Sequence, residues 1–309
     1  MKKYLVTGAA GFIGSAIAAS LLNDGHQVWT IDNLSTGFRK NLPKGIKFIE
    51  GDCQSPAGIT HLKKTRFDAI LHIAGQSSGE ASFDDPIYDL RTNTESTLRL
   101  IQYGLANGCA RFIYASSMSV YGEVPDRPIA EDFPCTPLSF YGVGKLASEN
   151  YMRIYQSKGL KPTSLRYFNV YGPNQNMANL RQGMVSIYLA QFIKNDEVIV
   201  KGSKDRFRDL SYIDDVVDFT VNIIDDERAF GGIYNFGTGR RTTVGELLEK
   251  ITCLGGLKKK IVFSSGTPGD QKGIYADMSL VEKTFGFRPK YDLEEGLTKM
   301  ITWAQQASW

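Results

Sequence analysis

The sequence predicts an α/β fold in which helices cover both faces of one parallel sheet. Short apolar runs alternate with amphipathic segments through the first half of the chain, and this alternation is typical of strand–helix–strand units. The apolar runs are nearly continuous, as in strands that are buried on both faces. A glycine-rich turn follows the first run and opens the first amphipathic segment. We therefore expect a doubly wound parallel sheet, with a smaller α/β lobe towards the C-terminus.

The apolar runs define the expected strands, which are Tyr4–Thr7, Val28–Ile31, Lys47–Glu50, Ala69–Ile73, Phe112–Ser116 and Thr163–Arg166. Amphipathic segments between them, such as Ser15–Asn23 and Thr94–Asn107, are the expected helices. Each such helix would connect two parallel strands across one face of the sheet.

The chain changes character after Tyr171, where the polar, turn-rich segment Gly172–Gly183 begins. We expect a second lobe from this point, with its cleft facing the first. The later segments Ser211–Asp226 and Tyr234–Phe236 are expected to return to the large sheet. The expected domains are a nucleotide-binding unit at 1–170, rejoined by about 211–238, and a substrate-binding lobe at 171–309.

Composition and charge argue against several classes of function. Lysine and arginine total 36 against 33 acidic residues, a net charge of +3, and the basic cluster Lys258–Lys260 is too short for a nucleic-acid-binding or membrane-binding tail. No apolar run reaches the length of about 18 residues that a membrane span needs. Glycines interrupt the N-terminal apolar run, which we interpret as a buried strand and not a signal peptide. The four cysteines and three histidines show no metal-ligand spacing. We expect a cytoplasmic protein without a metal.

The motif TGAAGFIG places Gly8, Gly11 and Gly14 between the first strand and the first helix. In a Rossmann fold such glycines make the tight turn, let the backbone approach a pyrophosphate and let helix and strand pack closely. Asp32 ends the second expected strand, where a carboxylate accepts hydrogen bonds from the adenosine ribose. That carboxylate would repel a 2′-phosphate, so NAD is favoured over NADP, although Arg39 lies close in sequence.

The stretch FYGVGK places Tyr141 and Lys145 four residues apart before a long helical run. On a helix this spacing brings both side chains to one face. The pair alone fits two interpretations: a half-buried aromatic beside a solvated charge, or a tyrosine acid/base beside a cation.

Motifs along the whole chain favour the second interpretation. The sequence resembles the extended short-chain dehydrogenases/reductases, within the nucleotide-sugar epimerase and dehydratase group, and is most similar to the UDP-glucose (UDP-hexose) 4-epimerases. The motifs that carry the resemblance, in order, are TGAAGFIG, DNLSTG, GD at 51–52, HIAGQSS, SSMSVYG, YGVGK, LRYFNVYGP, RFRDLSYIDD, YNFGTG and PGDQKGIYAD.

The resemblance implies that Tyr141 is the acid/base that takes a proton from a sugar hydroxyl. A free tyrosine has a pKa of about 10, and a nearby cation lowers it by stabilising the phenolate. Lys145 and oxidised nicotinamide would supply positive charge, and Lys145 would also hold the nicotinamide ribose. Ser117 aligns with the hydroxyl residue that bonds the reacting oxygen, in preference to Ser116.

By the same resemblance NAD would stay bound through the cycle. The residues expected to bind it are Gly8, Gly11, Phe12, Ile13, Gly14, Asp32, Asn33, Ser35, Thr36, Gly37, Asp52, Cys53, Ile73, Ala74, Gly75, Asn93, Ser116, Tyr141, Lys145 and Tyr167. Two of these have a competing interpretation, since Asn93 could instead hold a bend in the backbone and Cys53 could be an ordinary buried cysteine.

The substrate, by resemblance, is a nucleotide-activated hexose such as a UDP-hexose. Residues expected to contact it are Ser77, Ser117, Tyr141, Asn169, Val200, Arg208 and Asp270. Arg208 suits a phosphate because its guanidinium is planar and permanently charged. Relatives often carry an arginine where this chain has Thr267, so one phosphate contact is expected either to be missing or to be supplied elsewhere, by Arg181 or Arg206.

The segment SSMSVYG narrows the reaction. Similar dehydratases carry an Asp–Glu pair at the positions of Met118 and Ser119, and similar decarboxylases carry a glutamate at the position of Ser119. Methionine and serine cannot supply that acid–base work. An epimerase is therefore favoured, in which the C4 hydrogen leaves, a 4-keto sugar turns over, and the hydrogen returns to its other face. A 4,6-dehydratase, a 4-keto reductase and a non-catalytic NAD-binding protein are the alternatives.

Sugar specificity stays open at the level of sequence. Glu80 would disfavour uronic acids if it faced the sugar, and would have no effect if it faced solvent. Ile274 aligns with the wall that limits bulk at C2, and an isoleucine there leaves both hexoses and N-acetylhexosamines possible. His72 is interpreted as a packed strand-end residue. We expect a homodimer formed through the helices near 94–107 and 146–158.

Overall fold

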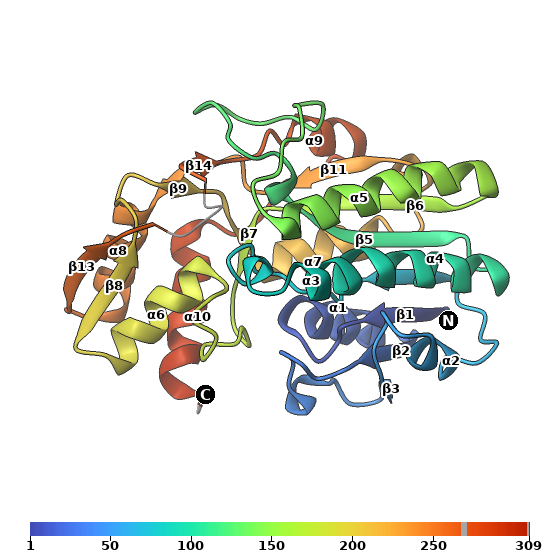
Figure 1. The fold of residues 1–309 in the computed structure, drawn as a ribbon. Coiled ribbons are helices and arrows are strands. Elements are labelled where there is room, and N and C mark those ends of the chain that lie inside the picture. The colour runs from blue at the N-terminus through green and yellow to red at the C-terminus, as the bar shows by residue number, and fades with distance from the viewer. Residues whose placement is uncertain (267–270, 308) are drawn as a thin grey trace.

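A seven-stranded parallel sheet forms the body of the protein in the computed structural model, which describes residues 1–266, 271–307 and 309 (Figure 1). Its strand order is β11-β6-β5-β4-β1-β2-β3. The strands are β1 (Lys3–Thr7), β2 (Gln27–Asp32), β3 (Lys47–Glu50), β4 (Ala69–His72), β5 (Arg111–Ser117), β6 (Lys161–Tyr167) and β11 (Ile233–Phe236). The order reverses between β1 and β4, which creates the crevice where ligands bind in such sheets.

The six strands expected from the sequence are all confirmed, with ends that differ by two residues at most. Every residue of β4 and β5 is buried, as the continuous apolar runs predicted. The expected return of Tyr234–Phe236 is also confirmed, because β11 pairs with β6 at the edge of the sheet. The doubly wound α/β fold class is therefore confirmed.

Helices cover the two faces of this sheet. Alternate strand residues divide the core: Tyr4 and Val6 pack with the face that carries α1 (Phe12–Asn23) and α7 (Ile213–Asn222), while Leu5 packs with the other face. The second face carries α4 (Ser96–Ala106) and α5 (Phe140–Tyr155), together with the shorter helices α2 (Pro56–Thr60) and α3 (Pro86–Leu90).

The later part of the chain forms a smaller group of elements beside the carboxyl ends of the strands, on the left of Figure 1. Its helices are α6 (Met184–Lys194), α8 (Val244–Gly255) and α10 (Leu293–Gln306), and α9 (Ser279–Phe285) packs near β11. Its strands form three small sheets: β8 (Glu197–Lys201) with β13 (Lys260–Ser264); β7 (Asn169–Tyr171) with β10 (Leu210–Tyr212); and β9 (Phe207–Arg208) with β12 (Thr242–Thr243) and β14 (Gly273–Ile274).

The segment Ser211–Asp226 approaches the large sheet as a helix and not as a strand: Ser211 lies in β10, which pairs with β7, and the segment then becomes α7. The helix returns to the large sheet by packing beside α1. The division into domains at 1–170 and 171–309 stays a prediction.

Two negative findings apply to the described residues. None of their helices combines the length and apolarity that crossing a bilayer would require. Within the same part of the chain, no cluster of three or more histidine, cysteine or acidic side chains is placed to hold a metal ion.

A buried ion pair joins α5 to β6 beneath the carboxyl end of β5. Arg166 donates to both carboxylate oxygens of Glu149, at 3.0 and 2.7 Å, and the two side chains are 4% and 2% exposed. The Ser116 hydroxyl donates to the same carboxylate at 2.5 Å. This pair fixes the position of α5 relative to the strand that precedes the cleft.

We expect Glu149→Ala to lower the free energy of unfolding by about 3–5 kcal/mol, because it leaves the Arg166 charge buried without its partner. Glu95→Ala is the matched control, since Glu95, just before α4, forms a partly exposed pair with Arg99 of that helix and such pairs contribute about 0.5 kcal/mol. Urea unfolding of both variants measures the difference. Equal stability of the two variants would contradict a structural role for the buried pair.

Candidate active site

Two adjoining cavities lie at the carboxyl ends of the central strands, with volumes of about 760 and 400 Å³. The smaller cavity is lined by the glycine-rich turn after β1 and by the end of β2. The larger one lies between α5, the end of β5 and the small sheets of the later elements. Residues shared by both walls, among them Phe12, Ile73 and Gly75, make the two cavities one continuous cleft.

The turn after β1 has a backbone that only glycine fits at two positions. Gly8 has a φ of +75°, and a Cβ there would lie 2.8 Å from the Ala74 backbone. A Cβ at Gly14 would lie 2.3 Å from the Gly8 carbonyl oxygen. Gly11 differs, because its Cβ would meet only that oxygen, at 3.2 Å. It precedes α1 and lines the smaller cavity, where an absent side chain leaves room for a phosphate at the helix N-terminus.

Asp32 lies at the end of β2 on the wall of the smaller cavity. Its two oxygens accept hydrogen bonds from the backbone N–H of Ala10, at 2.9 Å, and of Leu34, at 2.8 Å. The carboxylate is thereby held at the rim of the glycine turn. Arg39, which left NADP possible, is paired with Glu50 and does not line the smaller cavity. This arrangement favours NAD.

Most of the residues expected to bind the cofactor lie along the cleft. Those that line one or both cavities are Gly8, Gly11, Phe12, Ile13, Gly14, Asp32, Asn33, Ser35, Thr36, Gly37, Asp52, Cys53, Ile73, Ala74, Gly75, Ser116, Tyr141, Lys145 and Tyr167. Their backbone-rich cradle and single carboxylate at the end of β2 fit a dinucleotide that lacks a 2′-phosphate.

Asn93 does not line either cavity, and its expected contact with the cofactor stays a prediction. It lies in a π-helical turn, Arg91–Glu95, and is only 1% exposed. Its amide donates to the Gln76 carbonyl at 3.0 Å and to the Asp89 carboxylate at 3.1 Å. Asn93 therefore links the loop after β4 to α3 through these hydrogen bonds, which agrees with its competing structural interpretation.

Tyr141 and Lys145 lie in the first two turns of α5, whose N-terminus is capped by the Ser139 hydroxyl. Both side chains are buried at the wall of the larger cavity. The Lys145 ammonium donates to the Ala115 carbonyl at 2.8 Å and lies 5.6 Å from the centre of the Tyr141 ring. The spacing of four residues thus brings the two groups together, as the sequence predicted.

Burial dominates the acid–base behaviour of this pair in the protein alone. It lowers the pKa of Lys145 to about 8, while the carboxylates of Asp89 and Glu149 oppose the shift. It raises the pKa of Tyr141 to about 12, and a hydrogen bond with Ser117 opposes that rise. Desolvation of the phenolate thus determines the pKa of Tyr141 in the protein alone, and a lowering by Lys145 together with oxidised nicotinamide stays a prediction.

The hydroxyls near Tyr141 differ in what they bind. Ser117 lines the larger cavity, and its oxygen accepts from the Ser119 N–H at 3.1 Å, which leaves its proton available to a ligand or to Ser119. Ser116 instead donates to Glu149. Met118 and Ser119 also line the larger cavity, so the two positions that distinguish dehydratases face the cleft without a carboxylate.

His72 is buried and hydrogen-bonded on both ring nitrogens, to Thr7 at 2.9 Å and to Ser96 at 3.1 Å. Burial lowers the pKa of its ring to about 3, so the imidazole stays neutral. This agrees with its interpretation as a packed residue.

Polar groups gather at the far end of the larger cavity. Arg208 is 4% exposed and donates to the carbonyls of Phe207 and Gln271, at 2.7 and 3.0 Å. Burial and the charge of Arg206 lower the pKa of Arg208 to about 10. An anion in the cavity would oppose both effects, because it stabilises the positive charge of the guanidinium. Asn169 lines the same cavity, and its side-chain oxygen is buried without a hydrogen-bond partner among the described residues.

Two residues expected at the substrate do not line the cavity. Side chains alternate along β8, so Val200 is fully buried in the core while Ile199 and Lys201 face the cleft. Ile274 packs in a buried cluster with Met118 and Val120. Lys201 is thus a cavity residue that the sequence argument missed, although the alternation in VIVKG could have indicated it. Ser77 lines both cavities. Asp270 and Thr267 lie outside the described residues.

Comparisons with known proteins agree with this geometry. The sequence model of the NAD dependent epimerase/dehydratase family matches residues 4–237. A UDP-glucose 4-epimerase of Mycolicibacterium smegmatis is 32% identical, over 98% of this chain and 99% of the relative.

Two solved structures are similar over nearly their whole length. The UDP-glucose 4-epimerase of Thermotoga maritima, with UDP-glucose, is 32% identical at a TM-score of 0.94, over 98% of this chain and 99% of the other. The UDP-glucose 4-epimerase of Thermus thermophilus, in complex with NAD, is 33% identical at a TM-score of 0.92, over 99% and 100%.

We expect Gly11→Ala to fold normally and to lose at least about tenfold in affinity for NAD, because its methyl group would stand where the backbone must approach a pyrophosphate. Gly245→Ala is the matched control: it also lies at a helix start, and its Cβ would meet atoms at 3.6 Å or more. Calorimetric titration with NAD measures both affinities. Wild-type affinity in Gly11→Ala would contradict the assignment of the smaller cavity to the cofactor.

Proposed function

The chain belongs to the NAD dependent epimerase/dehydratase family, and on that premise we propose that it is an NAD-dependent 4-epimerase of a UDP-activated hexose. The observation that carries the proposal is the wall of the larger cavity. It brings Tyr141, Lys145 and Ser117 together and presents Met118 and Ser119 where a dehydratase would need two carboxylates.

The residues of the smaller cavity would hold the cofactor. The glycine turn would bind its pyrophosphate through backbone N–H groups, and Asp32 would accept hydrogen bonds from the adenosine ribose. When bound, NAD supplies a hydride acceptor beside the sugar and a positive charge at the oxidised nicotinamide. That charge favours the phenolate form of Tyr141, which burial alone disfavours.

The reacting hydroxyl of the sugar would lie between Tyr141 and Ser117. Tyr141 as phenolate accepts the proton of the C4 hydroxyl while the C4 hydrogen leaves with its electron pair, which gives a 4-keto sugar. The Ser117 hydroxyl donates to the sugar oxygen and keeps it in reach of Tyr141. Lys145, which is fixed by its hydrogen bond to the Ala115 carbonyl, contributes positive charge that stabilises the phenolate of Tyr141. Return of the hydrogen to the opposite face of C4, with the proton from Tyr141, completes the inversion.

The other end of the substrate would lie against Arg208 and Asn169. A buried guanidinium with a lowered pKa is a suitable partner for a diphosphate, because the negative phosphates stabilise its protonated form. The unpaired oxygen of Asn169 would accept from a hydroxyl of the substrate. Lys201 and Ile199 also line the larger cavity.

We also propose that two copies form a homodimer through the face of α3, α4 and α5. Large apolar side chains are exposed on two of these helices, including Ile87 (59%) and Leu90 (53%) on α3, and Val143 (52%) and Ile154 (53%) on α5. Burial of such side chains between copies is favourable, and exposed apolar patches are typical of interfaces.

Proton NMR of the purified protein with UDP-glucose and with UDP-N-acetylglucosamine, without added cofactor, tests the proposed reaction. We expect a second anomeric signal that grows to an equilibrium mixture, because hydrogen returned to the sugar regenerates NAD in each cycle. A new 6-deoxy methyl signal would instead identify a dehydratase. Tyr141→Phe should lower kcat by at least about a thousandfold and leave bound NAD in place. Undiminished turnover in that variant would exclude Tyr141 as the acid/base.

A further inference from the structure

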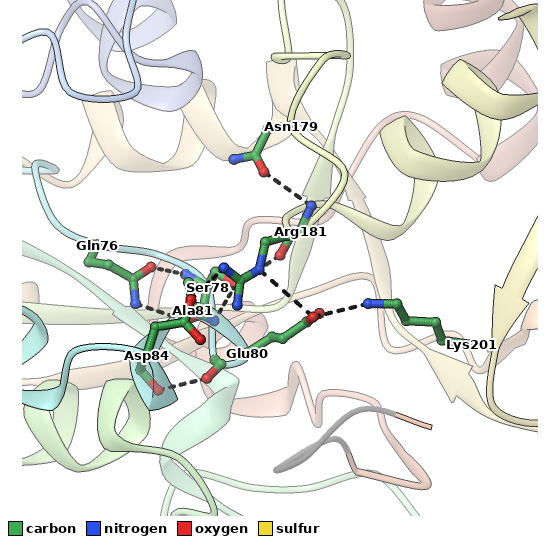
Figure 2. Close-up of polar contacts among 10 residues, drawn as sticks. Gln76, Ser78, Glu80, Ala81, Asp84, Asn179, Arg181 and Lys201 are labelled. Carbon is green, nitrogen blue, oxygen red and sulfur yellow. Dashed lines mark hydrogen bonds and ion pairs between the residues drawn. The ribbon is translucent and has the colours of Figure 1, made fainter. Parts of the chain in front are cut away.

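A chain of charged side chains crosses one side of the larger cavity, and the reaction described above does not use it (Figure 2). Lys201 contacts the Glu80 carboxylate at 3.0 Å, and the same carboxylate lies 3.8 Å from Arg181. Arg181 in turn contacts Asp84 at 2.5 Å. We refer to Glu80, Asp84, Arg181 and Lys201 as the charge bridge.

The charge bridge joins three segments that are far apart in sequence. Glu80 and Asp84 flank the short turn Ala81–Phe83 after β4, Arg181 lies in the segment before α6, and Lys201 ends β8. Backbone contacts hold these segments together: the Ser78 hydroxyl donates to the Arg181 carbonyl at 2.8 Å and accepts from the Ala81 N–H at 3.1 Å. The Glu80 side chain therefore has a defined position on the cavity wall.

Glu80 lies towards the reactive end of the cavity. A Cβ built on its neighbour Gly79 would be 3.5 Å from the Ser139 hydroxyl, and Ser139 caps α5 two residues before Tyr141. The loop that carries Glu80 thus packs against the start of the helix that carries the proposed acid/base. A sugar in reach of Tyr141 would therefore share the larger cavity with the Glu80 side chain.

The charges of the bridge are balanced. Its two cations, Arg181 and Lys201, already face two carboxylates, and the Glu80 side chain is only 28% exposed. A hexuronic acid would bring a further carboxylate beside Glu80, without an uncompensated cation in the bridge to receive it. Like charges at such a partly buried site repel one another. A neutral hexose carries a hydroxymethyl group at the same carbon and meets no such repulsion.

We propose that Glu80 is a specificity-determining residue that selects neutral hexoses against hexuronic acids, by occupying the two cations that would otherwise receive the sugar carboxylate. The inference rests on the proposed function. It answers the question that the sequence left open, since Glu80 lines the cavity and is engaged there with both cations.

The test compares kcat/KM for UDP-glucose and UDP-glucuronate in two variants of opposite expected effect. Glu80→Gln keeps the shape of the side chain and releases Lys201, so its uronate-to-hexose ratio should rise by at least about tenfold over wild type. Lys201→Met leaves Glu80 less compensated, so its ratio should fall below that of wild type. A ratio unchanged in both variants, or shifted in the same direction in both, would overturn the proposal.

Two further variants are the controls. Asp84→Asn removes a carboxylate at the exposed end of the bridge and leaves Glu80 in place, so it should raise the ratio by less than Glu80→Gln does, because solvent screens that position. Glu95→Gln removes the carboxylate that pairs with Arg99, at the end of the π-helical turn Arg91–Glu95, and should not change the ratio. Circular dichroism checks that all four variants are folded.

Calorimetric Kd values for UDP-glucose and UDP-glucuronate, measured on the same proteins, separate this inference from the proposed function. If the wild type converts neither UDP-glucose nor UDP-N-acetylglucosamine, the epimerase proposal fails, while the ratio of the Kd values for UDP-glucose and UDP-glucuronate still tests the role of Glu80. If UDP-glucose is converted and the Kd ratio is the same in wild type, Glu80→Gln and Lys201→Met, the epimerase proposal stands and the role of Glu80 is refuted.

Discussion

The burial of Lys145 beside Tyr141 is the constraint on which the rest of the site depends. An ammonium inside a protein is stable only where carbonyls and carboxylates compensate its charge. Here the Ala115 carbonyl receives it at 2.8 Å, and the charges of Asp89 and Glu149 favour its protonated form. Because Ala115 belongs to β5 and Lys145 to α5, this contact fixes the proposed acid/base against the carboxyl edge of the sheet. Ala115, Tyr141 and Lys145 thereby form one continuous part of the wall of the larger cavity.

The groups around this lysine are themselves held by the fold. Glu149 is locked by Arg166 from the neighbouring strand, and Asp89 accepts hydrogen bonds from Gln76 and from Asn93 in a π-helical turn. Such turns often occur at functional sites. The site is therefore built with a desolvated phenol of raised pKa and a desolvated ammonium of lowered pKa. This arrangement keeps Tyr141 as the neutral phenol, which cannot accept a proton from the sugar, until further positive charge is placed beside it.

The sequence predicted the parts of this structure that depend on local patterns. Continuous apolar runs located the six strands, the glycine spacing located the turn after β1, and the four-residue spacing placed Tyr141 and Lys145 on one face of α5. The residues whose positions or roles the sequence did not predict depend on contacts between segments that are far apart in the chain. Val200 was assigned to the cavity although strand alternation turns it into the core. Glu80 could not be interpreted because its partner Lys201 is 121 residues away in sequence, and no local pattern indicates such a contact.

Titration of Tyr141 by NMR of protein labelled with ¹³C at tyrosine Cζ tests the central claim most directly, with Tyr141→Phe used to assign the signal. In cofactor-free protein we expect the phenol to stay protonated until about pH 12, because burial disfavours the phenolate. With oxidised NAD bound, the pKa of Tyr141 should fall by at least about two units, since a neighbouring positive charge favours the charged form. An ordinary pKa of about 10 in the cofactor-free protein, or an equal pKa with and without NAD, would contradict the account.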